Sequence, residues 1–343
     1  MIYFITNREI IKKGSKETIR EDGKETAGDN LRFGSYDIKK REFILFPEPQ
    51  ADADLDYAKA TSDTEMSAKS TELKGSARFF TDLYKAFTSE PAIKMADLEK
   101  SDTLFFIHGF NTDLKSLRET IDNLHKKYVE NPDSPVGHII VFTWPGRSPV
   151  LPLHYHDDKK DAIRSGEALA RGILKVTEFL RKTLVQERNP ACNKKIHLMA
   201  HSMGNRVLKH TILELERLQA GIPELFEEIL IMAADVEYDI FEPQEAFYKL
   251  IDFGRRVHIY FHDKDHVLSI SKYTKNFSNR LGKYGRKYVN TSLTDVFDVD
   301  VSKTKDDKGS GIGTNLLNHW YYHSSQMVVN HIIEVLKGKN PKL

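Results

Sequence analysis

The sequence predicts an α/β protein with a mostly parallel central sheet that helices cover on both faces. Six short apolar segments, each of four or five residues, recur along the chain and are rich in β-branched or aromatic residues. Near-continuous apolar character is typical of strands that are buried on both faces. The intervening segments have helical periodicity, and regular alternation of strand and helix favours right-handed crossovers into one parallel sheet.

The elements of this core follow from the positions of the apolar side chains. The predicted strands are residues 103–107, 138–142, 196–199, 229–232, 257–261 and 296–299. Between the strands, apolar residues at spacings of three and four predict amphipathic helices within 114–128, 169–184 and 207–218. Gly221 is a suitable residue to end the last of these helices. A further apolar helix is expected over residues 328–336.

The N-terminal part of the chain has a different pattern. Residues 2–5 and 43–46 have the character of strands, and residues 30–34 that of a turn between them. We therefore expect an antiparallel edge extension of the sheet. Residues 49–75 are poor in large apolar side chains and predict a solvated loop or a loose helix.

These patterns predict a single globular unit with two parts. The first part, residues 1–100, holds the N-terminal edge strands and the polar excursion, packed on the core. The second part, residues 101–343, is the core itself, which carries the motifs described below.

Composition excludes several classes of protein. The chain has 343 residues, 40% of them hydrophobic, and 51 Lys and Arg against 50 Asp and Glu, a formal net charge of +1. No general attraction to nucleic acid or to an anionic membrane is therefore expected. One cysteine, Cys192, excludes an intramolecular disulfide and a CxxC metal site. The sequence shows neither a signal-peptide pattern nor an apolar run of about 20 residues, so we expect a cytoplasmic protein.

A strand followed by a small-x-Ser-x-Gly motif lies in the middle of the sequence. Residues 196–205 read IHLMAHSMGN, with Ser202 between Ala200 and Gly204, and a helical pattern follows at once. A nucleophile elbow needs this context, because small flanking residues let strand and helix meet at a sharp turn. Such a turn exposes Ser202 Oγ and places the Met203 N–H at a helix N-terminus, where negative charge is favoured. The alternative role for the serine is a simple helix N-cap.

The motif His108-Gly109-Phe110-Asn111 ends the first core strand and precedes a helix. Acyl transfer needs a second N–H donor opposite the elbow, supplied by the loop after an earlier strand. Gly109 lets the backbone turn tightly, and we expect the Phe110 N–H to be this donor, with the Asn111 N–H as the alternative. Phe110 and Met203 would together form an oxyanion hole.

An acidic residue is expected between the serine and a general base. Asp263 and Asp265 follow the strand at 257–261, at the strand end where ligand sites of open α/β sheets lie. We favour Asp265, and Asp235 is the main alternative because it also follows a buried strand. With His262 and His266, Asp263 and Asp265 form a cluster of possible metal ligands. Neighbouring residues of an extended segment point to opposite faces, so the cluster converges poorly on an ion and we expect no metal site.

Two late histidines, His319 and His323, are the candidates for the general base. We favour His319 because it falls in the loop, whereas His323 is nearer to the start of the final helix and is the alternative base. His319 would take the Ser202 proton and return it to the leaving group, while Asp265 fixes the His319 tautomer. This chemistry requires no cofactor.

With these motifs the sequence resembles the alpha/beta-hydrolase superfamily and, within it, a bacterial group of uncharacterised, predicted serine esterases. The elbow and the His-Gly loop carry the superfamily resemblance. Weaker similarity is spread along nearly the whole chain. It lies in residues 6–8, 32–34, 142–146, 265–269, 280–282 and 319–322. The resemblance implies an eight-stranded hydrolase architecture and serine hydrolase chemistry, without a particular substrate.

We therefore expect a serine hydrolase whose partner is a small-molecule ester or other acyl compound. The alternatives are an amidase, thioesterase or peptidase with the same triad, and a non-catalytic binding protein on the same scaffold. Residues 145–160, rich in proline and aromatics, are expected to form a lid or pocket wall. Residues 271–288 are a candidate for a second lid. The basic and aromatic side chains within 272–287 either contact a membrane surface or belong to a solvated amphipathic helix.

Overall fold

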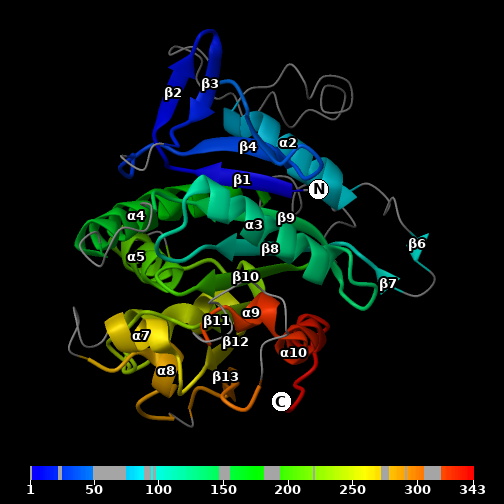
Figure 1. Ribbon diagram of the computed structural model, residues 1–343. Helices are drawn as coiled ribbons and strands as arrows, with labels where there is room; N and C mark the ends of the chain where they lie inside the picture. The colour runs from blue at the N-terminus through cyan, green and yellow to red at the C-terminus, as the bar shows by residue number, and fades with distance from the viewer. Residues whose placement is uncertain are drawn as a thin grey trace.

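One large sheet with helices on both faces organises the chain (Figure 1). The computed structural model describes residues 2–21, 25–48, 75–88, 94–95, 98–146, 155–180, 194–218, 221–271, 278–289, 292–304 and 318–343. The α/β fold class that the sequence predicts is confirmed. The predicted excursion at 49–75 lies outside the described residues except for Gly75, as does Cys192.

The large sheet has the strand order β13-β12-β11-β10-β8-β9-β1-β4-β5. Its strands are β1 (Ile2–Thr6), β4 (Arg32–Asp37), β5 (Glu42–Leu45), β8 (Asp102–Ile107), β9 (Val136–Thr143), β10 (Ile196–His201), β11 (Phe226–Met232), β12 (Gly254–Phe261) and β13 (Val296–Asp300). Every strand from β13 to β1 is parallel to its neighbour, and β4 and β5 are antiparallel additions at one edge. All six predicted core strands are confirmed.

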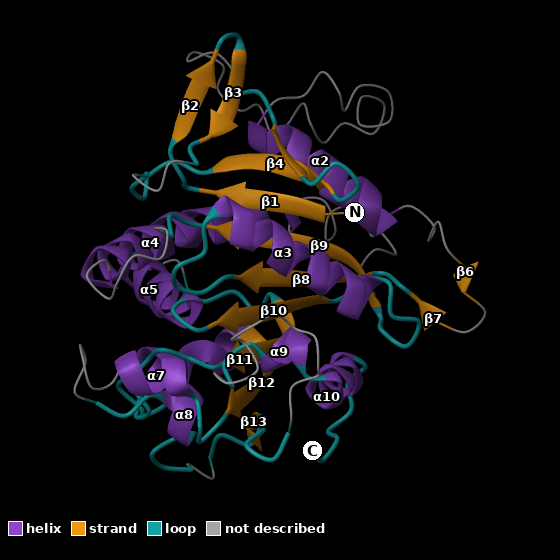
Figure 2. Cartoon of the chain, in the orientation of Figure 1, coloured by secondary structure: helices purple, strands orange, loops and turns teal. Residues whose placement is uncertain are grey.

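The helices lie on the two faces of the sheet (Figure 2). Apolar side chains of α2 (Gly75–Thr88), α4 (Tyr155–Leu180) and α5 (Gly204–Arg217) pack on one face, with Phe105 and Ile107 of β8. Those of α3 (Leu114–Leu124) and α10 (Gln326–Leu336) pack on the other, with Leu104 and Phe106. Alternate residues of β8 thus enter two cores, which explains why the strand is apolar throughout.

Shorter elements complete the described chain. Two small hairpins pair β2 (Ile10–Lys13) with β3 (Lys16–Ile19), and β6 (Lys94–Met95) with β7 (Leu98–Glu99). The remaining described helices are short: the α-helices α6 (Leu250–Phe253), α7 (His266–Ser271), α8 (Leu281–Tyr284) and α9 (Tyr321–Ser324), a π-helix at His125–Val129 and a 3-10 helix at Ala246–Lys249. None of the described helices combines the length and the apolar character needed to cross a bilayer.

The N-terminal region corrects one prediction. The sequence predicts a turn at residues 30–34, but Arg32–Asp37 is strand β4. The large sheet therefore has nine strands rather than the eight implied by the resemblance. Gly34 sits here because a Cβ at that position would lie 2.3 Å from the Phe4 ring of β1. The glycine therefore makes room for a core side chain and does not mark a turn. β1 itself is parallel to β9, and within the large sheet the antiparallel pairs described are β1 with β4 and β4 with β5.

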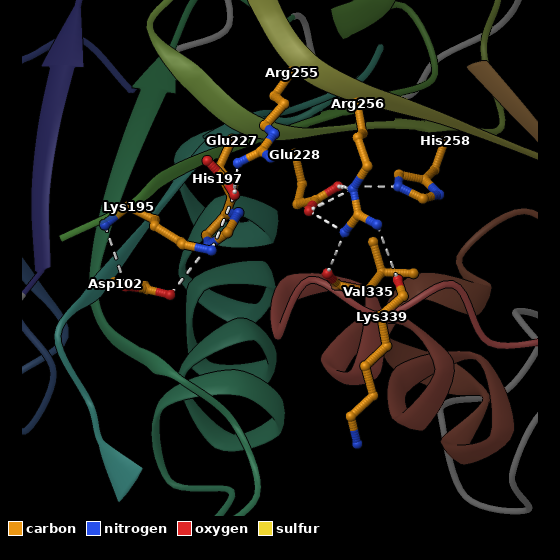
Figure 3. Close-up of polar contacts among 10 residues, drawn as sticks. All are labelled: Asp102, Lys195, His197, Glu227, Glu228, Arg255, Arg256, His258, Val335 and Lys339. Atoms are coloured by element: carbon orange, nitrogen blue, oxygen red, sulfur yellow. Dashed lines mark hydrogen bonds and ion pairs between the residues drawn. The ribbon is translucent and has the colours of Figure 1, made fainter. Parts of the chain in front are cut away.

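Buried charges cluster where β8, β10, β11 and β12 begin (Figure 3). Glu228 is fully buried and accepts hydrogen bonds from Arg256 and from His258 Nε2, the latter at 3.0 Å. Arg256 also donates to the carbonyl of Val335 at 3.2 Å and to that of Lys339 at 3.3 Å. This arginine therefore ties the C-terminal end of α10 to the sheet, at the edge opposite the carboxyl ends of the strands.

Burial of several histidines predicts acid sensitivity of the fold. Burial lowers the pKa of His138, His210 and His323 to about 4 and that of His108 to about 3. The unfolded chain takes up these protons near pH 6.5, before the folded chain does, so stability is complete above pH 6.5 and is lost as pH falls toward 4. We expect each such histidine to contribute about 1.4 kcal/mol per pH unit in this window.

Urea unfolding between pH 7.5 and 5 measures this effect. The midpoint should be nearly constant above pH 6.5 and fall below it, and the variants His138→Gln and His210→Gln should each make this fall shallower. A midpoint that is constant across the range would contradict the prediction.

Candidate active site

Ser202 occupies a strained turn between β10 and α5. Its φ is 52°, in the left-handed region that a residue other than glycine rarely adopts. Two backbone hydrogen bonds hold the turn, from Ser202 N to Met232 O at 2.9 Å and from Asp235 N to Ser202 O at 3.1 Å. The neighbouring strand β11 thereby fixes the conformation that the small-x-Ser-x-Gly motif predicts.

Two glycines allow close backbone contact around the serine. A Cβ on Gly204 would lie 2.6 Å from the carbonyl oxygen of His108 and 2.7 Å from that of Ile107, so α5 can start here only without a side chain. A Cβ on Gly109 would lie 2.8 Å from Ser202 Cβ. The loop after β8, which the sequence predicts to supply an oxyanion donor, is therefore in contact with the serine.

Asn205 braces the same turn, a role that the sequence did not reveal. Its buried side-chain amide donates to the carbonyl of Ala200 at 2.9 Å and to those of Ser202 and Met232 at 3.2 and 3.3 Å. The only signal in the sequence was the polar residue directly after the motif glycine. A polar residue there would otherwise be expected to face solvent.

The structure brings together the favoured acid and the favoured base. His319 Nδ1 lies 2.6 Å from Asp265 Oδ2, and both side chains are buried. The other carboxylate oxygen of Asp265 accepts the Leu268 N–H at 2.8 Å, in the first turn of α7. The His319 carbonyl accepts a hydrogen bond from His201 Nε2 at 3.0 Å, which ties the histidine loop to the residue before Ser202.

The two alternative residues have other surroundings. The Asp235 carboxylate lies 3.7 Å from Arg280 Nε, and both side chains are buried. His323 lies in α9, where burial lowers its pKa to about 4. Among the described contacts, the carboxylate that is hydrogen-bonded to His319 is Asp265.

A cavity of about 470 Å³ lies over these residues. Ser202 and His319 line it together with the alternative base His323 and the loop residues from His108 to Thr112. Helix α3 contributes a polar wall of Ser116, Glu119, Thr120 and Asn123. The remaining lining is mainly aromatic and consists of His201, Val267, Trp320 and Tyr322. Met203 is fully buried, at the N-cap of α5. The cavity brings predicted site residues from three distant parts of the chain to one space.

The two segments predicted to shape access are only partly described. Residues 147–154 and 272–277 lie outside the described part, and residues 155–160 form the start of α4 instead of a loop. Arg280 and Arg286 of the basic segment are buried and paired, with Asp235 and Glu237 for the first and Asp298 for the second. These two cations are structural and are not available for a membrane surface.

No group of three or more His, Cys, Asp or Glu side chains suited to hold a metal ion is found within the residues that the structure describes. In particular, His262, Asp263 and Asp265 do not form such a group. His262 Nδ1 accepts the Lys264 N–H at 3.1 Å, and Asp265 faces His319.

The fold and this arrangement agree with the comparison to known families. The chain belongs to the family described as alpha/beta hydrolase of unknown function (DUF900), whose sequence profile matches residues 86–336. No curated protein and no solved structure matches the chain. The family match confirms the alpha/beta-hydrolase resemblance. It covers the turn at Ser202, the loop from His108 to Thr112 and the loop that contains His319. Residues 1–85, with β1, β4 and β5, lie outside it.

Proposed function

We propose that this protein is a serine hydrolase that cleaves a carboxylic ester through an acyl-enzyme on Ser202. The hydrogen bond of 2.6 Å between His319 Nδ1 and Asp265 Oδ2 is the main support, because His319 and Ser202 line the same cavity. An imidazole whose Nδ1–H is held by a carboxylate has its other nitrogen free to act as a general base. The strained turn at Ser202 is a second support, since such strain is found at reactive positions.

In this mechanism His319 Nε2 accepts the proton of Ser202 Oγ while Oγ attacks the acyl carbon. Asp265 holds the His319 tautomer and stabilises the imidazolium that forms. The N–H groups of Phe110 and Met203 donate to the oxyanion of the tetrahedral intermediate. Its collapse breaks the bond to the alcohol, which takes the proton from His319. Water, deprotonated by His319, then attacks the acyl carbon. The second tetrahedral intermediate collapses by breaking the bond to Ser202 Oγ, which takes the proton back from His319 as the acid is released.

Reaction with a fluorophosphonate probe, together with hydrolysis of p-nitrophenyl esters of increasing chain length, tests this proposal. We expect stoichiometric labelling of the folded protein, with the phosphonyl group on the peptide that contains Ser202. An ester that the enzyme hydrolyses should slow this labelling by competing for the serine. Unfolded protein serves as the control, because labelling depends on the activated serine. Absence of labelling together with absence of ester hydrolysis would contradict the proposal and favour a non-catalytic binding protein on this scaffold.

The choice between substrates of one mechanism needs a separate comparison. Matched acyl compounds that differ only in the leaving group, an alcohol, a thiol or an amine, should be hydrolysed with the ester preferred. Faster turnover of the amide or the thioester, with the same serine labelled, would keep the mechanism and replace the substrate class.

A further inference from the structure

A buried arginine from the N-terminal segment contacts the loop beside Ser202. Arg8 follows β1, outside the family match, and its side chain is fully buried. Its guanidinium donates to Glu25 Oε1 at 2.6 Å, to the Thr112 carbonyl at 2.6 Å and to Thr143 Oγ1 at 2.7 Å. These partners belong to three separate segments, and Thr112 belongs to the loop that lines the cavity.

The contact with Thr143 continues to His108. Thr143 Oγ1 accepts from Arg8 Nε and lies 3.2 Å from His108 Nε2, so the hydroxyl proton is left to donate to the ring. The Trp144 N–H donates to the same nitrogen at 3.1 Å, and the Trp144 indole stacks on the imidazole. His108 Nε2 is therefore an acceptor, and the ring proton is on Nδ1, which donates to the Gly109 carbonyl at 2.9 Å.

The orientation of this carbonyl determines the direction of the expected oxyanion donor. The Gly109 carbonyl and the Phe110 N–H belong to one planar trans peptide and point in opposite directions. Thr112 Oγ1 also donates to the Gly109 carbonyl, at 3.1 Å. Two hydrogen bonds on the carbonyl thus hold the Phe110 N–H toward the other side of the peptide, and Gly109 itself is against Ser202.

A second effect of Arg8 acts on the protonation of His108. Burial and the nearby guanidinium lower the pKa of His108 to about 3. A protonated ring would present a second N–H to the Trp144 N–H, which requires an acceptor at this position. The positive charge of Arg8 therefore favours the neutral ring on which the hydrogen-bonded chain depends.

We propose that Arg8 and Thr143 are positioning residues for the oxyanion hole, acting through the neutral Nδ1–H tautomer of His108 on the Gly109–Phe110 peptide. This inference rests on the proposed serine hydrolase activity. It assigns to the N-terminal segment, which lies outside the family match, a part in stabilising the transition state. Neither residue is among those that line the cavity at Ser202.

Substitutions at Thr143 test this series of hydrogen bonds without removing the buried charge of Arg8. Thr143→Val keeps the volume but has no hydroxyl, and we expect kcat for a p-nitrophenyl ester to fall about 10- to 100-fold with KM within about twofold. The affinity for a boronic acid, which mimics the tetrahedral intermediate, should fall by the same factor as kcat/KM. Thr143→Ser, which restores the hydroxyl, should regain most of the activity.

Thr211→Val is the matched control. Thr211 is also buried and its hydroxyl is hydrogen-bonded, to the carbonyls of Val207 and Gly166, but it belongs to α5 away from the loop. We expect it to change the melting temperature as much as Thr143→Val does and to leave kcat unchanged. Equal kcat values for the wild type and Thr143→Val, or equal losses in the two valine variants, would overturn the inference.

Nitrogen-15 NMR of the His108 ring provides a readout that does not depend on activity. The wild-type ring should be neutral at pH 7 with the proton on Nδ1, and Thr143→Val should shift the Nε2 resonance. A proton on Nε2 in the wild type would overturn the inference even if the enzyme is active. An inactive wild type that also fails to react with the fluorophosphonate would contradict the proposed function, and the positioning role with it.

Discussion

Replacement of His319 by alanine should lower kcat for ester hydrolysis by about 10⁴- to 10⁶-fold. The imidazole is the group that would move the proton from Ser202 to the leaving alcohol, and Asp265 Oδ2, 2.6 Å from its Nδ1, holds it for that step. Without the ring, the serine hydroxyl keeps its ordinary low reactivity. Steady-state kinetics with a p-nitrophenyl ester, together with the rate of fluorophosphonate labelling, measure the loss.

His323→Ala is the internal control for this variant. His323 lines the same cavity as His319. Burial lowers the pKa of His323 to about 4, so its ring is neutral near pH 7. We expect a change of less than about tenfold in kcat, since its ring has no described carboxylate partner to fix its tautomer. A large loss in His323→Ala together with a small one in His319→Ala would assign the base to His323.

The double variant Ser202→Ala/His319→Ala gives a further check on the same hypothesis. Residues that act as one unit are strongly non-additive, so the double variant should be no slower than the slower single variant. Two losses that multiply would mean that Ser202 and His319 act independently. The proposed triad would then be wrong, although each residue alone would still matter.

The core of the fold could be predicted because its signal is local. In β8, Leu104 and Phe106 enter one core and Phe105 and Ile107 the other, so the strand is apolar along its whole length. The same reasoning failed at residues 30–34, where Gly34 was interpreted as part of a turn. What the glycine accommodates is the ring of Phe4, a residue thirty positions earlier, and such a contact leaves no trace in the local pattern.

In the candidate site, too, residues with a local signal could be predicted and contacts between distant residues could not. The strand–Ser–helix motif and the order of serine, acid and base predicted Ser202, Asp265 and His319, because each lies at an element boundary that the pattern defines. The contacts of Arg8 could not be predicted, since Thr143 is 135 residues away and nothing near Arg8 indicates a buried position. Buried cations such as Arg280 show the reverse error, because a basic segment in the sequence does not distinguish paired interior charges from a charged surface.

Replacement of Asp265 by asparagine should lower kcat by about 10⁴-fold. An asparagine can keep an oxygen toward the Leu268 N–H of α7, which now lies 2.8 Å from Asp265 Oδ1. Its amide nitrogen then faces His319 Nδ1, where a donor replaces an acceptor, so the imidazole must change its tautomer. The nitrogen toward Ser202 would carry a proton and could no longer accept one. We expect an intact fold and a slow enzyme, measured by melting temperature and kcat.

Asp235→Asn should give the opposite result and therefore separates the two acids. Its carboxylate lies 3.7 Å from the buried Arg280, so loss of the charge should lower the free energy of unfolding by about 1–3 kcal/mol. The described contact between Asp235 and the serine turn is the hydrogen bond from its backbone N–H to the Ser202 carbonyl. Asparagine retains this N–H, so kcat should stay within about tenfold. A fast Asp265→Asn beside a slow, stable Asp235→Asn would place the acid after β11. Of these two carboxylates, the one that sets the His319 tautomer should control the rate, and the one paired with Arg280 should control the stability.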